Sequence, residues 1–210
     1  EISKPEYRWF PADESLEDSR ANLIPPLVEK LRKEVEKFRA SNYEGATHTS
    51  KSLLNWWFNN KHFISNQDQD VEFKYFFGQR EAIETIIYLI DIKKMSGTLD
   101  LHPFDSSGVL SSQYLSEPWL RTVVKMATGS GKTKVMSLFI AWSYFHKKYE
   151  IDSIMSNNFL MIAPNIIVLE RLMTDFDGLK IFSVDPIIPP DGFEGINWQS
   201  EFNMDIHIQN

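Results

Sequence analysis

The stretch Thr122–Tyr149, TVVKMATGSGKTKVMSLFIAWSYFHKKY, decides the fold. Its short β-branched run, Thr122–Val124, leads into a turn rich in Gly and Ser. Lys132 then opens a segment whose apolar residues recur at helical spacing. A strand, a glycine loop and a helix in this order are the context of a phosphate-binding loop. The stretch therefore predicts an α/β fold in which this loop holds a nucleotide.

The residue types in the loop suit a triphosphate. Gly129 and Gly131 place no Cβ in front of the backbone N–H groups, which can then point at phosphate oxygens. The N-terminus of the following helix adds partial positive charge. Lys132 would reach the β- and γ-phosphates, and the Thr133 hydroxyl would coordinate Mg²⁺. We therefore assign cofactor binding to Thr128, Gly129, Ser130, Gly131, Lys132 and Thr133, catalysis to Lys132 and Thr133, and the metal to Thr133.

One position departs from the usual G-x-x-x-x-G-K-[ST] pattern, because Met126 stands where that pattern has its first Gly. The form A-x-T-G-S-G-K-T resembles the phosphate loop of superfamily 2 helicases and translocases. A glycine turn that binds no ligand is the plainer alternative. The strand and helix around the loop favour the nucleotide.

Composition narrows the class of protein. The 210 residues allow one or two domains, and the absence of cysteine excludes disulfides and thiolate metal sites. No apolar run reaches the roughly 20 residues of a membrane-spanning helix. We expect no membrane contact and a cytoplasmic location. The net charge of −7 argues against a small dedicated nucleic-acid-binding module, but not against a motor with a local binding groove.

Residues 1–70 predict a mostly helical N-terminal extension. Pro25 and Pro26 precede an amphipathic helix that ends near Ser41. Its lysines are interleaved with glutamates, which favours a solvated face over a basic stripe for nucleic acid. Ser50 is expected to cap a second helix. The polar run 66–70 marks the boundary to a second unit, residues 71–210.

A second signal lies in the stretch 71–94, VEFKYFFGQREAIETIIYLIDIKK. Gly78 precedes a predicted helix that begins at Gln79 and ends near Lys94. The Gln79 amide has one donor and one acceptor group, which together can read an adenine edge. Aromatic residues before a helix more often pack in a core. Upstream of TGSGKT, however, this arrangement resembles the adenine-reading glutamine motif of superfamily 2 motors.

The C-terminal part alternates predicted strands and helices. The apolar run FLMIAP at 159–164 predicts a parallel strand buried on both faces. Asn165 is expected to cap a helix that runs to about Phe176. Residues 179–184 suggest another strand, and the alternation in 204–209 predicts a further one. The helix N-terminus at Pro164 and Asn165 is a suitable seat for a nucleic-acid phosphate, so both residues are assigned to nucleic-acid binding.

Taken in order, the phrases YFFGQREAIETIIYL, KMATGSGKT and LMIAPNIIVLERL resemble the helicase (Res) subunit of type III restriction endonucleases and related DEAD/DEAH-type helicase-family proteins. The resemblance covers residues 71–190 well and the first 70 poorly. It implies a RecA-like P-loop NTPase domain with a mainly parallel sheet flanked by helices. It also implies ATP and Mg²⁺ as cofactors, duplex DNA contacted through its backbone, and a DNA-modification methyltransferase subunit as partner.

The acidic D-E-x-[HD] box of that family is missing, since the sole Asp-Glu pair, Asp13–Glu14, lies upstream of every motif. We therefore expect a truncated first RecA-like domain from an ATP-dependent DNA helicase or translocase of a restriction or phage-defence system, inactive by itself. Two alternatives stay open. One is another P-loop phosphotransferase, against which Gln79 and the APN stretch argue. The other is a nucleotide-gated nucleic-acid-binding module that does not hydrolyse ATP.

Overall fold

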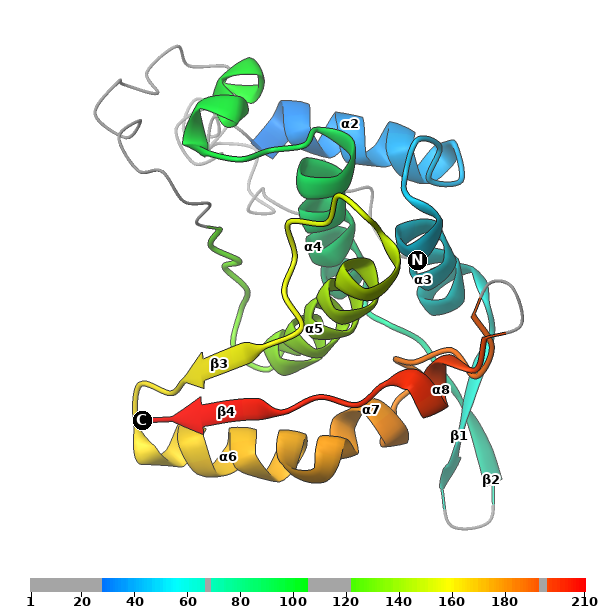
Figure 1. The fold of residues 1–210 in the computed structure, drawn as a ribbon, viewed down its shortest axis with the longest axis vertical. Coiled ribbons are helices and arrows are strands. Elements are labelled where there is room, and N and C mark those ends of the chain that lie inside the picture. Colours follow the sequence, from blue (N-terminus) through cyan, green and yellow to red (C-terminus); the bar gives the residue numbers. More distant parts are fainter. Residues whose placement is uncertain (1–27, 67–68, 106–121, 193–195) are drawn as a thin grey trace, which may run out of the picture.

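The computed structural model describes residues 28–66, 69–105, 122–192 and 196–210. Helices make up most of this part, and four strands form two small sheets (Figure 1). The fold is therefore α/β, as expected. In chain order the elements are α2 (Val28–Ala40), α3 (His48–Asn59), β1 (His62–Asn66), β2 (Gln69–Phe73), α4 (Phe77–Ile87), a π-helical turn (Tyr88–Ile92), a 3₁₀ helix (Thr98–Phe104), α5 (Lys132–Tyr149), β3 (Phe159–Ile162), α6 (Ile166–Phe176), a 3₁₀ turn (Asp177–Leu179), α7 (Lys180–Val184), α8 (Trp198–Glu201) and β4 (Ile206–Gln209).

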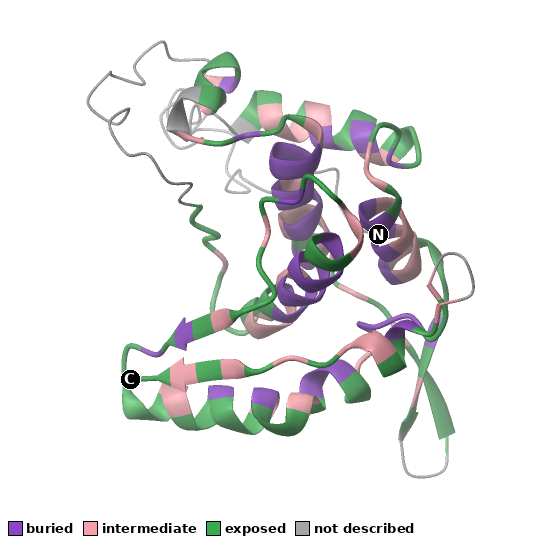
Figure 2. Ribbon diagram, in the orientation of Figure 1, coloured by how far each residue is buried: buried purple, intermediate pink, exposed green. Residues whose placement is uncertain are grey.

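Helices α3, α4 and α5 form the centre of the molecule, where buried residues concentrate (Figure 2). Each contributes apolar side chains at three- and four-residue spacing, as an amphipathic helix does. Burying one such large side chain contributes roughly 1.5–3 kcal/mol. The core thus fixes α5, the helix that starts at the glycine loop. The fully buried side chains at this junction are Leu53, Leu54, Ile83, Ile87, Leu138, Ala141 and Trp142.

A buried carboxylate joins α2 to α4. The Glu84 side chain is fully buried and accepts hydrogen bonds from Arg39 Nε at 2.8 Å, Tyr43 Oη at 2.8 Å and Arg80 Nε at 2.7 Å. Two guanidinium groups therefore compensate one charge in the interior, which is the condition under which a carboxylate can be buried. The N-terminal helix is held to α4 by polar as well as apolar contacts.

The N-terminal segment also reaches the C-terminal part of the chain. Trp56 and Trp57 on α3 donate from Nε1 to the carbonyls of Pro186 at 2.9 Å and Ile187 at 2.7 Å. Trp57 is buried, in line with the packing role of this aromatic pair. The described N-terminal helices therefore share one hydrophobic core with α4 and α5. The division of the chain at residue 70 stays a prediction.

The polar run at 66–70 has a different local structure from the one expected. Strands β1 and β2 form an antiparallel hairpin in which Asn66 pairs with Gln69. The run therefore includes the ends of two paired strands, and residues 67–68 between them lie outside the described part. The hairpin extends away from the helices (Figure 1).

Several predicted helices are confirmed, with one wrong cap. Helix α2 ends at Ala40, next to the expected Ser41, although Pro25 and Pro26 lie outside the described residues. Helix α6 covers the predicted range and is capped by Asn165. Ser50, however, does not cap α3. Thr47 does so, because its hydroxyl accepts the backbone N–H of Ser50, and this starts the helix three residues earlier.

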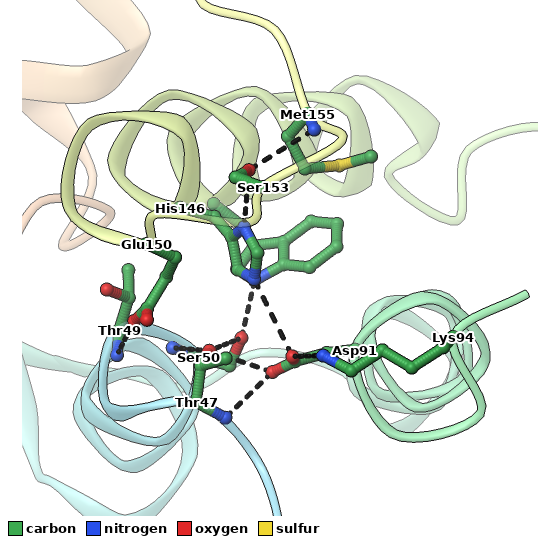
Figure 3. Close-up of polar contacts among 10 residues, drawn as sticks. Thr47, Thr49, Ser50, Asp91, Lys94, His146, Glu150, Ser153 and Met155 are labelled. Carbon is green, nitrogen blue, oxygen red and sulfur yellow. Dashed lines mark hydrogen bonds and ion pairs between the residues drawn. The ribbon is translucent and has the colours of Figure 1, made fainter.

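The long helix predicted from Gln79 to Lys94 is α4 extended by the π-helical turn Tyr88–Ile92. This turn carries the buried Asp91 side chain towards α3 and α5 (Figure 3). Asp91 accepts from the Thr47 backbone N–H at 2.9 Å, and His146 Nε2 lies 3.6 Å away. Burial alone would raise the pKa of the Asp91 carboxyl, but the nearby His146, Ser50 and Thr47 groups hold it well below its usual range. A buried carboxylate thus links three central helices.

Both predicted strands, β3 and β4, are present and β3 is parallel as expected. It pairs with β4, and Phe159 lies opposite Ile206. The expectation that β3 is buried on both faces is wrong, because Leu160 and Ile162 are 58% and 73% exposed while Met161 is buried. Helix α6 lies along one side of the pair (Figure 1). Among the described residues no element covers the other side, so β3 alternates between covered and exposed positions.

Two predicted strands are wrong. Residues 122–127 have no regular structure, because a strand needs a hydrogen-bonding neighbour and no described segment pairs with them. Lys180–Val184 is the helix α7 instead. Helix α6 ends at Phe176, and Gly178 and Leu179 after it both have φ of 58°, which separates α6 from α7. The buried side chains Ile181 and Phe182 are adjacent, as on a helix rather than a strand.

Candidate functional site

The glycine loop makes a tight turn immediately before α5. Gly129 and Gly131 have φ of 79° and 86°, a left-handed region that side chains with a Cβ rarely adopt. Gly131 is the N-cap of α5, and the backbone N–H groups of Lys134 and Val135 donate to its carbonyl. The two glycines therefore shape the loop and start the helix, as the sequence predicts.

The N–H groups at the start of α5 are available for a ligand. The backbone N–H groups of Gly129, Gly131, Lys132 and Thr133 have no acceptor among the described residues. The ammonium of the exposed Lys132 donates to the carbonyls of Met126 at 3.0 Å and Ala127 at 2.9 Å. An anion placed here would meet four backbone donors, the positive end of a helix and one cation.

Gln79 lies against this loop. The amide is 5% exposed, donates from Nε2 to the Ser130 carbonyl at 3.1 Å, and accepts the Phe76 N–H on Oε1 at 3.0 Å. A Cβ built on Gly131 would lie 2.1 Å from Gln79 Nε2. The start of α4 therefore packs directly on the loop, and both groups of the amide are engaged within the protein.

A groove of about 770 Å³ joins the loop to the C-terminal helices. The predicted site residues Gln79, Thr128, Gly129, Gly131, Lys132, Thr133 and Pro164 all line it. Ser130 is turned away, since its hydroxyl donates to the Ala127 carbonyl at 2.6 Å and the residue lines a neighbouring cavity of about 490 Å³. The fold thus brings together three sequence segments that are far apart in the chain.

The groove has an excess of positive charge. Its ionisable lining comprises Lys132, Lys134, Arg171, Lys180, Asp175 and Asp185. Lys134 forms an ion pair with Asp185. Burial lowers the pKa of the Lys134 ammonium, and the Asp175 carboxylate opposes this shift. Four cations against two carboxylates suit a polyphosphate ligand.

Asn165 lies at the mouth of this region as the N-cap of α6. Its side-chain oxygen accepts the Val168 N–H at 3.0 Å, and both Asn165 and the preceding Pro164 are exposed. Pro164 lines the groove, whereas Asn165 is not among its lining residues. The cap is confirmed, and nucleic-acid binding by these two residues stays a prediction.

Sequence reasoning missed the contribution of α6 and α7 to the groove. Val168, Arg171, Leu172 and Asp175 lie at three- and four-residue spacing, so they share one face of α6. That spacing is a readable signal. Lys180 and Asp185 give no comparable signal in the sequence. The strand predicted at 179–184 gave no reason to place both side chains in the groove.

In the parts of the chain described by the structure, no three His, Cys, Asp or Glu side chains are grouped to hold a metal ion. No described helix has the length and apolar character needed to span a membrane.

One family of known proteins matches the part of the chain that carries these motifs. The profile of the family described as type III restriction enzyme, res subunit, matches residues 72–203, which is more than half of the chain and includes the whole groove. A search of curated proteins and a search of solved structures found no match. The chain therefore belongs to the type III restriction enzyme res subunit family, a family of helicase superfamily 2.

Proposed function

We propose that this chain is the ATP-binding part of an ATP-dependent DNA helicase or translocase from a restriction or phage-defence system. The observation that carries the proposal is the groove in which the glycine loop, Gln79 and the C-terminal helices meet. The family assignment supports a nucleic-acid motor that uses ATP. A methyltransferase partner follows from the family resemblance alone.

The residues at the loop fit MgATP. Four backbone N–H groups without a described acceptor would receive phosphate oxygens, and Lys132 would exchange its two carbonyl partners for them. The Thr133 hydroxyl, which lines the groove, would take one coordination position of Mg²⁺. The bound metal would neutralise phosphate charge during transfer of the γ-phosphoryl group. The two residues assigned to catalysis, Lys132 and Thr133, would thus also take part in holding the ligand.

Base recognition by Gln79 would have to be compatible with its contacts to the protein. One N–H of its amide already donates to Ser130, and its oxygen accepts from Phe76, which leaves one N–H and one lone pair for a base. Phe76 is 69% exposed beside this amide, so its ring is free to contact a base. We propose that Gln79 recognises the base and also holds the phosphate loop in place through its contact with Ser130.

We propose that duplex DNA contacts the N-terminus of α6. Pro164 is exposed at the edge of the nucleotide groove, and the helix start at Asn165 presents partial positive charge. Nucleotide and DNA would then bind at neighbouring points of the same surface. This arrangement favours a motor over a P-loop phosphotransferase, which has no need of a nucleic-acid seat.

The 210-residue chain by itself is expected to bind ATP without useful turnover. A carboxylate that completes the metal site beside Thr133 and an arginine from another domain are needed for the reaction, and losing an arginine finger alone costs on the order of 10³–10⁵ in rate. The groove carboxylates nearest to such a role are Asp175 and Asp185, and Lys134 already pairs with Asp185. DNA-stimulated phosphate release by this chain, well above that of a Lys132→Ala variant, would contradict this expectation.

Binding of MgATP measured by calorimetry tests the proposal. Lys132→Ala should weaken binding by about tenfold or more, because it removes the cation nearest to the phosphates. Lys61→Ala, at an exposed position outside the groove, is the matched control and should bind like the unaltered chain. Equal MgATP affinity of the Lys132→Ala and Lys61→Ala variants would contradict the assignment of the glycine loop as the phosphate site. ATP binding with the same affinity in the presence and absence of DNA would instead favour a simple nucleotide-binding module.

A further inference from the structure

A second cavity, of about 600 Å³, lies between α2 and the 3₁₀ helix Thr98–Phe104. None of its lining residues belongs to the nucleotide groove, and Figure 1 shows α2 at the opposite end of the molecule from α6 and α7. Its ionisable lining comprises Lys30, Lys33, Lys37, Lys93, Glu34 and Asp100. We call the four lysines the lysine face.

The spacing of the lysine face matches a run of phosphates. Lys30, Lys33 and Lys37 lie three and four residues apart, so they project from one side of α2. At a rise of about 1.5 Å per residue they span about 10 Å along the helix. One strand of duplex DNA carries a phosphate about every 3.4 Å along its axis. Over about 10 Å one strand presents about four phosphates, and the three lysine side chains can meet members of that run.

The cations of this face are weakly committed to partners within the protein. Lys33 pairs with Glu29, and Lys37 pairs with Glu34, but these are exposed ion pairs within one helix, which contribute little to stability. Lys30 forms no ion pair with any described residue. A phosphate can replace such partners at small cost, because exposed pairs are already hydrated.

The acidic residues of the cavity leave a positive balance. Glu34 is shared, since it accepts from Lys37 at 2.9 Å and from Tyr88 Oη at 3.1 Å. Asp100 accepts the backbone N–H groups of Ser96 and Gly97, which compensate its charge locally. Four lysines therefore face two occupied carboxylates on a chain whose net charge is −7. The lining of this cavity is therefore positively charged, although the chain as a whole is negatively charged.

Lys93 comes from a different element and is positioned by aromatic rings. Its ammonium lies 5.3 Å from the centroid of Tyr88 and 6.0 Å from that of Phe104, within the range of cation–π contacts. Phe104 is buried and lines the cavity. These ring contacts restrict the exposed Lys93 side chain, which reduces the entropy that it would lose on binding a phosphate.

We propose that the lysine face is a second nucleic-acid contact, which binds the phosphate backbone of duplex DNA independently of the α6 N-terminus. The choice of DNA over other polyanions rests on the proposed function. Lysine ammonium groups act as point charges and carry no base-reading fork, so the contact should be independent of DNA sequence.

Binding of a short fluorescent DNA duplex over a range of salt concentrations tests this inference. The Lys30→Glu/Lys93→Glu double variant should bind about tenfold or more weakly, and the slope of log affinity against log salt should fall by about 2. Lys51→Glu/Lys61→Glu, with the same charge change outside the cavity, should lose much less. Lys30→Gln/Lys93→Gln should show an intermediate loss, and its melting temperature should match that of the unaltered protein.

Three outcomes would overturn the inference: equal losses in both Glu variants, an unchanged salt slope, or displacement of the duplex by polyglutamate at the same charge concentration as by unlabelled DNA. ATP binding by the same variants separates the two proposals. The lysine-face variants should bind MgATP normally. Failure of the unaltered protein to bind ATP would contradict the proposed function and leave the DNA result standing.

Discussion

The side-chain amide of Gln79 donates to the carbonyl of Ser130 over 3.1 Å, which joins the start of α4 to a loop 51 residues further along the chain. The same amide accepts the Phe76 N–H, so the glutamine makes a capping contact and a loop contact at once. A nucleotide base that displaced the contact with Ser130 would change how the phosphate loop is held. We therefore propose that Gln79 couples base recognition to loop geometry.

Replacing Gln79 should affect two properties together. Gln79→Ala should narrow the difference in affinity between ATP and GTP, and it should also weaken the binding of both, because the loop loses its contact at Ser130. Dissociation constants for the two nucleotides, measured on Gln79→Ala and on the unaltered protein, check this. A protein that binds ATP and GTP equally well before mutation would show that Gln79 does not read the base.

The two loop glycines should differ in sensitivity. Both have positive φ, so an Ala at either position costs about 1–2 kcal/mol of backbone strain. A Cβ at Gly131 would also displace Gln79 Nε2, whereas a Cβ at Gly129 meets no described atom within 4 Å. Gly131→Ala should therefore weaken MgATP binding more than Gly129→Ala does. Equal effects on affinity would mean that the Gln79 contact does not matter for the ligand.

The Glu84 cluster predicts a large loss of stability. Glu84→Gln removes a fully buried charge between Arg39 and Arg80 and should lower the free energy of unfolding by about 3 kcal/mol or more. Urea denaturation provides the measurement. Glu29→Gln, which breaks the exposed pair with Lys33, is the control and should leave the midpoint nearly unchanged. Similar midpoints for the two variants would contradict the role of the buried cluster.

Asn165 allows stability and DNA contact to be separated. Asn165→Asp keeps an acceptor for the Val168 N–H, so it should preserve the cap while its charge repels phosphate. Asn165→Ala loses the cap and should cost about 1 kcal/mol. DNA affinity should therefore fall in the Asp variant without a loss of melting temperature. Unchanged DNA affinity of a stable Asn165→Asp protein would exclude this helix start as a contact.

The phosphate loop and the helices around it were predictable because their signals are local. Glycines at positive φ, the Asn165 cap and apolar spacing along α5 are properties of neighbouring residues. The strand predicted at 122–124 failed for the opposite reason, since a strand depends on a partner far along the chain. The six apolar residues FLMIAP likewise could not show that one side of β3 stays exposed, because burial depends on which distant segments pack there.

The rest of the groove depends on tertiary structure. Asp185 lies near Lys134 only because Gly178 and Leu179 redirect the chain after α6, and a short helix follows where a strand was predicted. The engagement of both Gln79 groups was also unpredictable, because the sequence shows that an amide is present but not which partners it finds. The lysines of α2 are exposed, as expected of a solvated helix face. The sequence could not show that Lys93, after the π-helical turn, and Phe104, on the 3₁₀ helix, line one cavity with them.

Hydrogen exchange with and without MgATP shows whether the glycine loop and α6–α7 form two sides of one nucleotide site. MgATP should slow exchange in two separate segments, 128–134 and 175–185, and Lys132→Ala should lose both effects. The exposed hairpin of β1 and β2 should exchange at the same rate in both conditions. Protection of the loop alone, or of neither segment at saturating MgATP, would contradict this arrangement of the site.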